Sequence, residues 1–184
     1  MSAMATSEQH VSLSPRLAEI VDALPLRPGM RILEIGGAPG AAARAVVERI
    51  GDGHVLVIDR SAKGVAMVER LAAAEIAAGR MSVRCVAAED FELAPEEAAY
   101  DLAFAIRVGA LDGRHPRTGE QARRRIAAAL VPGGKLLVDG GDPLREIELA
   151  ARPGRRGRVN RRTHYGPRRA NDMPEGSWIS LAVQ

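Results

Sequence analysis

Short aliphatic runs alternate along the chain with longer segments in which apolar residues recur at helical spacing. The runs VLVI and LAFAI are apolar at every position, which is typical of strands buried on both faces of a parallel sheet. The pattern predicts five strands, which span residues 31–35, 54–58, 81–86, 102–106 and 135–138.

Helical patterns lie before and between these strands, and several carry an end signal. Gly51 and Gly79 follow two apolar stripes as C-terminal caps, and Thr118 with Gln121 fits a capping box. The alternation of strand and helix predicts an α/β fold with a doubly wound, mostly parallel sheet, whose ligand crevice lies at the carboxyl ends of the strands. The helices are expected at residues 15–24, 42–50, 65–76 and 118–130.

The C-terminal part of the sheet is expected to be abbreviated, because only 42 residues follow Asp142. Within them, residues 178–183 predict a terminal strand, and residues 146–151 predict either its partner or a short helix. We expect a flexible tail over residues 1–14 and one domain over residues 15–184.

The stretch RILEIGGAPG, residues 31–40, predicts a buried strand, a glycine-rich turn and the start of a helix. The dinucleotide fingerprint would need glycines at 36, 38 and 41, and only Gly36 matches it. The phosphate-binding P-loop also fails, because no lysine with a serine or threonine follows Gly40.

The turn does resemble the first motif of class I S-adenosylmethionine-dependent methyltransferases, an acidic residue, any residue, then Gly-x-Gly-x-Gly. Glu34, Gly36 and Gly40 stand at matching positions, and Ala38 replaces the central glycine beside Gly37. The resemblance covers roughly residues 15–142 and implies a Rossmann-like methyltransferase fold with S-adenosyl-L-methionine as the cofactor.

Two further segments extend the resemblance. HVLVIDRS ends in Asp59, 19 residues beyond Gly40, where a carboxylate can accept both ribose hydroxyls of the cofactor. VAAEDF is similar to the segment that holds the adenine. On this resemblance the expected cofactor contacts are Glu34, Gly36, Gly37, Ala38, Gly40, Asp59, Arg60, Ala88, Glu89 and Arg107.

Candidates for catalysis are few. Arg107 ends the fourth strand between cofactor and substrate, although a surface salt bridge would explain it equally well. His115 follows that strand and is the candidate base, and an exposed loop residue is the simpler interpretation. The single cysteine, Cys85, allows no internal disulfide and no cysteine-based zinc cluster, so we expect a small buried hydrophobic residue there and no metal site.

The net charge of +3 is an average over two different segments. Residues 1–150 hold 18 basic and 21 acidic side chains, whereas residues 151–184 hold 8 basic and 2 acidic ones. Eight arginines and no carboxylate lie between Arg152 and Arg169, which predicts a basic loop. A solvated segment or a lid over an anionic substrate is favoured there over a nucleic-acid contact, because the loop holds one aromatic residue.

The favoured function is methyl transfer to a nucleophilic atom of a small molecule, because no separate recognition domain is evident in the sequence. An RNA methyltransferase that uses the loop at 152–169, and a non-catalytic module that binds S-adenosylmethionine, remain as alternatives. The first dozen residues hold neither a basic start nor an apolar run, so we expect a cytoplasmic protein without a membrane partner. The oligomeric state stays open, a homodimer included.

Overall fold

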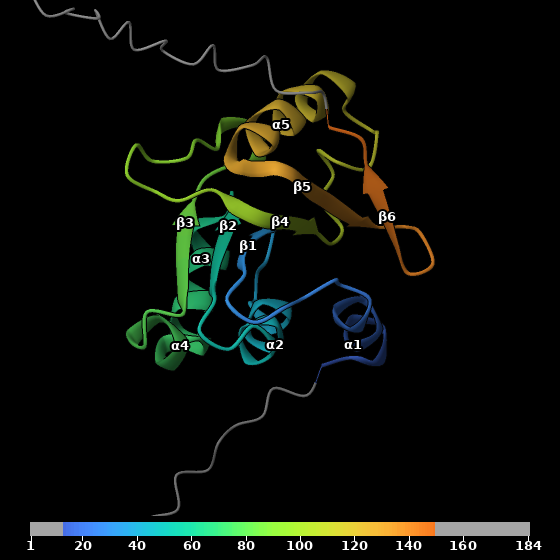
Figure 1. Ribbon diagram of the computed structural model, residues 1–184. Helices are drawn as coiled ribbons and strands as arrows, with labels where there is room; N and C mark the ends of the chain where they lie inside the picture. Colours follow the sequence, from blue (N-terminus) through green and yellow to red (C-terminus); the bar gives the residue numbers. More distant parts are fainter. Residues whose placement is uncertain (1–12, 150–184) are drawn as a thin grey trace, which may run out of the picture. The chain divides into compact units, whose positions relative to one another are not determined.

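The computed structural model describes residues 13–149, which form a six-stranded sheet with helices on its two faces (Figure 1). The strand order is β3-β2-β1-β4-β5-β6. The first five strands are parallel and β6 is antiparallel to β5, which confirms the expected mostly parallel α/β sheet. The strands are β1 (Arg31–Ile35), β2 (His54–Asp59), β3 (Met81–Cys85), β4 (Tyr100–Ala105), β5 (Leu130–Asp139) and β6 (Leu144–Ile147).

Two apolar layers, one on each face of the sheet, explain the continuous runs in the sequence. Alternate residues of β1 and β2 pack against α2 on one face, and the intervening residues pack toward α5 on the other (Figure 1). Ile32 and Leu33, for example, are both fully buried but belong to different layers. The helices are α1 (Pro15–Asp22), α2 (Ala41–Arg49), α3 (Ala62–Leu71), α4 (Ala73–Ala77) and α5 (Pro116–Ala129), with the 3-10 turn η1 (Ala88–Asp90).

The start of α5 corrects one sequence prediction. The helix begins at Pro116 with His115 as its N-cap residue, and the His115 side chain makes no capping hydrogen bond. A proline is favoured at the first helical position, so the helix starts two residues before the predicted Thr118. Gln121 donates to the Glu89 carbonyl at 3.0 Å instead of closing a capping box.

The ends of the described chain bear on three other predictions. Ser14, which the sequence assigns to the tail, caps α1 by accepting from the Leu17 N–H at 3.4 Å. The rest of the predicted tail, residues 1–12, lies outside the described residues. The segment after β5 forms a hairpin strand, β6, rather than a helix. The basic loop at 152–169 and the predicted strand at 178–183 both lie outside the described residues.

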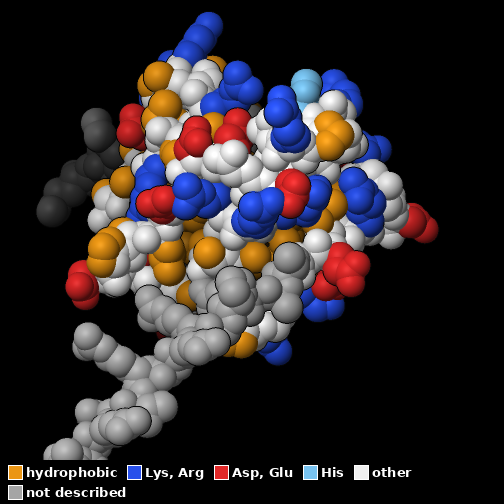
Figure 2. All heavy atoms as spheres, turned by 90° about the horizontal axis from the view of Figure 1, so that it is seen from above, with side chains coloured by type: hydrophobic (Ala, Val, Ile, Leu, Met, Phe, Trp, Pro, Cys, Tyr) orange, Lys and Arg blue, Asp and Glu red, His pale blue; other side chains and the backbone are white. Residues whose placement is uncertain are grey.

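The surface over α5 carries interspersed charges of both signs, as Figure 2 shows for the face seen from above. Arg124 pairs with Glu120 one helical turn away, and Arg125 pairs with Glu92 of the β3–β4 connection. Leu71 is the one large apolar side chain that is exposed among residues 13–149. The described part of the chain therefore shows charged side chains of both signs, rather than an apolar patch, to solvent.

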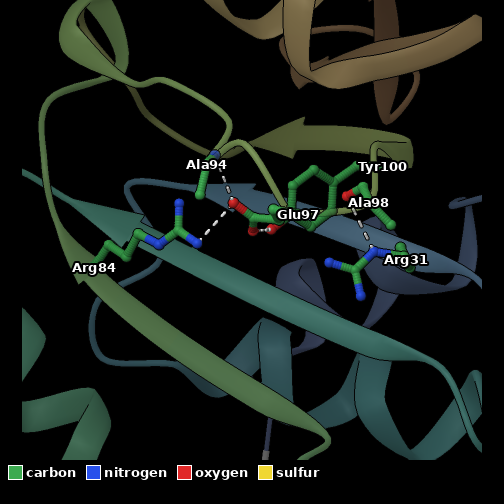
Figure 3. Close-up of polar contacts among 6 residues, drawn as sticks. All are labelled: Arg31, Arg84, Ala94, Glu97, Ala98 and Tyr100. Atoms are coloured by element: carbon green, nitrogen blue, oxygen red, sulfur yellow. Dashed lines mark hydrogen bonds and ion pairs between the residues drawn. The ribbon is translucent and has the colours of Figure 1, made fainter. Parts of the chain in front are cut away.

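The connection from β3 to β4 contains one short turn, η1, and a loop fixed by a cluster of polar side chains (Figure 3). The Glu97 carboxylate accepts from Arg84 Nη2 at 2.7 Å, from the Ala94 N–H at 3.1 Å and from the Tyr100 hydroxyl. Burial raises the pKa of Glu97, but the hydrogen bonds from Tyr100, Arg84 and Ala94 outweigh that effect and hold the pKa below its ordinary value. Glu97 thus fastens the loop to both ends of the connection.

Glu97→Ala is expected to lower the free energy of unfolding by about 2 kcal/mol, because the Tyr100 hydroxyl and the Arg84 guanidinium lose a shared acceptor. Since the pKa of Glu97 is lowered, this stabilisation is present above about pH 4.5 and is lost as the pH falls through the lowered value. Urea unfolding at neutral and acid pH measures both effects. Glu92→Ala removes an exposed ion pair and is expected to lower the free energy of unfolding by less than about 1 kcal/mol. Equal losses of stability in the two variants would contradict the role of Glu97 in fixing the loop.

Candidate functional site

A tight glycine turn carries the chain from the carboxyl end of β1 into α2. Gly36 follows β1 with φ +68°, and its N–H donates to the Ile58 carbonyl of β2 at 2.7 Å. A Cβ on Gly36 would lie 2.7 Å from Val108 Cγ2, which leaves no room for a side chain. Gly40 is the N-cap residue of α2 with φ +89°, a conformation that favours glycine.

Gly37 is required for a different reason. A Cβ on Gly37 would lie 2.7 Å from both Glu34 Cδ and Val57 Cγ1. The backbone of Gly37 therefore lies directly on the Glu34 side chain. The resemblance implies only a cofactor contact at Gly37, and the structure adds that this glycine makes room for the buried carboxyl group.

Ala38 departs from the glycine motif, and Gly64 on α3 accommodates its side chain. A Cβ on Gly64 would lie 2.9 Å from the Cβ of Ala38 and 3.4 Å from Asp59 Cγ. Gly64 is a contact that sequence reasoning missed, and its one signal was an isolated glycine within an apolar helical pattern.

Gly64→Ala is expected to weaken binding of the cofactor that the sequence resemblance implies, S-adenosylmethionine, by about tenfold, because the new Cβ displaces the Ala38 segment of the glycine turn. Ala38→Gly alone is expected to leave binding nearly unchanged, and the double variant Ala38→Gly/Gly64→Ala is expected to regain most of the affinity. Calorimetry on the four proteins gives the coupling between the two sites. Additive losses in the double variant would show that the contact between these residues does not carry the effect.

Asp59 connects the glycine turn to the start of α3. Its Oδ2 accepts from the Ala38 N–H at 3.3 Å and its Oδ1 accepts from the Ser61 N–H at 2.8 Å. Ser61 is the N-cap residue of α3, and its hydroxyl accepts from the Gly64 N–H at 3.1 Å. A carboxylate has about four acceptor sites, so Asp59 keeps capacity for hydroxyl groups of a ligand.

Glu34 is a buried carboxyl group with an unused oxygen. Its exposed fraction is 4%, and Oε2 has no hydrogen-bond partner among the described residues. Burial raises the pKa of Glu34 to about 8, the Ala43 backbone N–H lowers it in part, and the charge of Asp59 raises it further. An unpaired buried carboxyl group costs several kcal/mol unless a ligand completes its hydrogen bonds.

Two cavities adjoin the glycine turn, and Gly36 lines both of them. The first, of about 330 Å³, is called the Asp59 cavity, and the second, of about 400 Å³, is called the Glu34 cavity. Of the predicted site residues, Gly40 lines neither cavity and acts as the cap of α2. Asp59, Arg60, Ala88, Glu89 and His115 line the Asp59 cavity, whereas Glu34, Gly37, Ala38 and Arg107 line the Glu34 cavity.

Arg107 lies at the mouth of the Glu34 cavity in an unusual backbone conformation. It is exposed and has φ +57°, and its N–H donates to Asp139 Oδ1 at 3.0 Å. A residue with a Cβ is strained there by about 1 kcal/mol or more. No hydrogen bond or ion pair holds its guanidinium to the described residues, so the surface salt bridge considered in the sequence is not formed among them.

Three residues outside the glycine turn, Ala88, Glu89 and His115, also line the Asp59 cavity. Ala88 is buried and begins η1, and Glu89 is half-buried beside it. The bond from Gln121 to the Glu89 carbonyl fixes η1 to α5. Cys85, expected to be buried, is exposed instead, because it ends β3 at the edge of the described sheet.

Neither a metal site nor a membrane span is found among the described residues. No group of three or more histidine, cysteine, aspartate or glutamate side chains is placed to hold a metal ion in residues 13–149. Within the same residues, every helix is too short or too polar to cross a membrane.

Comparison with known sequences agrees with this geometry. A family profile described as "Methyltransferase domain" matches residues 32–134, which is more than half of the chain. A protein-L-isoaspartate O-methyltransferase of Methylorubrum populi is 35% identical over 135 residues, which cover 73% of this chain and 56% of the relative. The protein of that name from Methylorubrum extorquens is 34% identical over the same share of this chain and 52% of its own. The chain thus spans about half the length of the curated relatives it matches.

Solved structures show the same architecture. The [4+2]-cyclase SpnF is 29% identical with a TM-score of 0.54, and the match covers 67% of this chain and 43% of SpnF. The phosphoethanolamine N-methyltransferase 2 of Haemonchus contortus, in complex with S-adenosyl-L-methionine, is 27% identical with a TM-score of 0.53 over 67% of this chain and 27% of its own. The expected fold and the expected cofactor of the family are confirmed by these relatives. The chain belongs to the class I S-adenosylmethionine-dependent methyltransferases.

Proposed function

We propose that this protein transfers a methyl group from S-adenosylmethionine to a nucleophilic atom of a small molecule. The observation that carries the proposal is the placement of Glu34 and Asp59 in two cavities that share Gly36. In this proposal a ligand with a ribose at one end and an ammonium at the other contacts one carboxyl group in each cavity.

Each part of the cofactor has a partner in this proposal. Asp59 accepts the ribose hydroxyls, and the Ala88 N–H with the Arg60 and Glu89 side chains lies at the adenine. The unused Oε2 of Glu34 accepts from the cofactor's ammonium, which completes the hydrogen bonds of that buried group. Gly36 and Gly37 line the Glu34 cavity with their backbone, and side chains of the protein fill the space that a Cβ would need at either position.

The bound cofactor supplies an electrophilic methyl group on a sulfonium, which passes to the acceptor by in-line displacement and leaves S-adenosylhomocysteine. The residues of this chain orient the two reactants, and such alignment lowers the barrier by several kcal/mol. His115 is the proposed base for an acceptor that must lose a proton, since it lines the Asp59 cavity.

The size of the acceptor is proposed from the cavities. Together they are large enough for the cofactor and a small acceptor. The named relatives act on a protein L-isoaspartate or on phosphoethanolamine, so both chemistries belong in an acceptor panel.

The single cysteine supports a cytoplasmic location in this proposal.

A second candidate function is a reaction other than methyl transfer in a site that binds the same cofactor. The 29% identity to a structure named as a [4+2]-cyclase favours it, since that protein shares the fold. The alternative of an RNA methyltransferase depends on residues 152–169, which lie outside the described residues. Gel-shift titrations with RNA at two salt concentrations test that alternative.

Calorimetry with S-adenosylmethionine and mass spectrometry of an acceptor panel test the proposed function. We expect the full chain to bind the cofactor and to form S-adenosylhomocysteine together with one methylated product. Absence of binding at millimolar cofactor would contradict the assignment. Binding without any methylated product from isoaspartyl peptides, phosphoethanolamine, small amines or phenols would favour the second candidate.

A further inference from the structure

Arg107 occupies a backbone position that suits glycine. Its φ of +57° is the one positive value at a non-glycine residue among residues 13–149. Glycine adopts this left-handed region without strain, and asparagine adopts it more readily than arginine does. Because arginine is strained in this backbone conformation, we look for the function of Arg107 in its side chain.

The neighbouring strand holds Arg107 in this conformation. The Arg107 N–H donates to Asp139 Oδ1 at 3.0 Å, and Asp139 is the last residue of β5. The parallel pairing of β4 with β5 continues to Ala105 and Val138, so the two carboxyl ends reach the same edge of the sheet. The hydrogen bond therefore fixes the direction in which the Arg107 side chain leaves the backbone.

The guanidinium of Arg107 is available to a ligand. Arg44 and Arg84 pair with carboxylates on neighbouring elements, whereas the Arg107 guanidinium has no such partner among the described residues. Glu34 and Arg107 line the same cavity, where the Glu34 carboxyl group is buried and Arg107 is exposed.

We propose that Arg107 binds a carboxylate or phosphate group of the methyl acceptor and thereby determines specificity. This inference rests on the proposed function, and it assigns the Arg107 guanidinium to the acceptor instead of to the cofactor contact that the sequence resemblance implies. A guanidinium presents parallel N–H donors that match two oxygens of such a group, and the lysine ammonium does not reproduce that geometry. The cofactor carries a carboxylate of its own, so the test has to separate the two sources of the anion.

The test uses the full chain saturated with S-adenosylhomocysteine, in which any site for the cofactor's carboxylate is already filled. Inorganic phosphate and acetate are titrated into this complex and followed by NMR. We expect Arg107→Ala to weaken anion binding by about tenfold or more, with a smaller loss in Arg107→Lys. The affinity for S-adenosylhomocysteine is expected to stay within about twofold.

Arg70→Ala is the matched control. Arg70 is an exposed arginine on α3 that lines neither cavity, so its removal changes the net charge equally. Both affinities are expected to stay unchanged in this variant. An equal loss of anion binding in the Arg70 and Arg107 variants would show that the overall charge is responsible and would overturn the proposal.

Two other results would overturn it. Loss of S-adenosylhomocysteine affinity in Arg107→Ala, with no phosphate or acetate bound to the wild-type complex, would assign the guanidinium to the cofactor's carboxylate. Unchanged affinities for both ligands would show that Arg107 binds no oxyanion. If the wild type fails to bind S-adenosylhomocysteine, the proposed function is wrong, and the same anion titration of the free protein still tests Arg107.

Arg107→Gly separates the side chain from the backbone. The glycine and alanine variants both lack the guanidinium, so they are expected to lose anion binding equally. The glycine variant is expected to unfold a few degrees higher than the alanine variant, because glycine adopts φ +57° without strain. If anion affinity instead follows the unfolding temperature, a structural role explains the loss.

Discussion

Asp59→Ala is expected to lower the affinity for S-adenosylmethionine by at least about a hundredfold, or about 3 kcal/mol of binding free energy. Two effects combine in this loss. The ribose hydroxyls lose a charged acceptor, and the Ala38 and Ser61 N–H groups lose the carboxylate that holds the glycine turn against α3. Calorimetry of the variant, with its unfolding temperature measured in parallel, separates loss of binding from loss of folding.

Asp52→Ala is a suitable control for this experiment. Asp52 is an exposed aspartate in the turn after α2 and lines neither cavity, so its removal changes the net charge by the same amount. Its affinity for the cofactor is expected to match the wild type. If Asp59→Ala binds as tightly as this control, the ribose is held elsewhere and the cofactor assignment of the Asp59 cavity is wrong.

Glu34→Gln is expected to stabilise the free protein at about pH 9 by several kcal/mol while weakening cofactor binding. Burial raises the pKa of Glu34 to about 8, compared with 4.5 for an ordinary glutamate. Between these values the folded protein keeps a proton that the unfolded chain releases, so the free energy of unfolding of the wild type falls as the pH rises. The whole shift corresponds to at most about 5 kcal/mol.

Urea unfolding at about pH 5 and about pH 9 measures this difference. Glutamine keeps the shape of the side chain without a charge, so the two proteins are expected to differ little at the lower pH. Glu48→Gln, which changes an exposed carboxylate on α2, is expected to follow the wild type at both values. If the free energy of unfolding changes equally with pH in the wild type and in Glu34→Gln, Glu34 is not an uncompensated buried charge.

The same carboxyl group links cofactor binding to the pH. An ammonium beside Oε2 favours the ionised form of Glu34, so cofactor binding near neutral pH is expected to release a proton from the wild type. No such proton is expected from Glu34→Gln. Calorimetry in two buffers that differ in ionisation enthalpy detects it, and equal enthalpies for the wild type in both buffers would place the ammonium away from Glu34.

Local pattern was enough to predict the sheet. The apolar run at 31–35 coincides with β1, and the run at 54–58 ends one residue short of β2. β5 is longer than predicted, because Leu130 already pairs with Tyr100, ahead of the predicted strand at 135–138. A bulge between Tyr100 and Leu102 absorbs the change of register, and such an irregularity leaves no sign in the hydrophobic pattern.

The site was predictable as a set of positions but not as a set of contacts. Ordered motifs led to Glu34 and Asp59 without the structure, and their roles toward the cofactor stay predictions. The reasons why Gly37 and Gly64 are glycines depend on side chains that approach from other elements, Glu34 and Ala38. The spacing of residues along the chain does not give the distances between side chains of different elements. Sequence reasoning therefore missed the contacts of Gly37 with Glu34 and of Gly64 with Ala38.

The exposed thiol at the end of β3 has a practical consequence. Cys85 is the one cysteine of the chain and stands opposite Asp59 in the pairing of β2 with β3. A thiol-reactive fluorophore would therefore attach at a single position, one strand away from the carboxylate assigned to the ribose. The wild-type protein thus carries its own attachment point for an optical reporter of ligand binding, with no engineered cysteine.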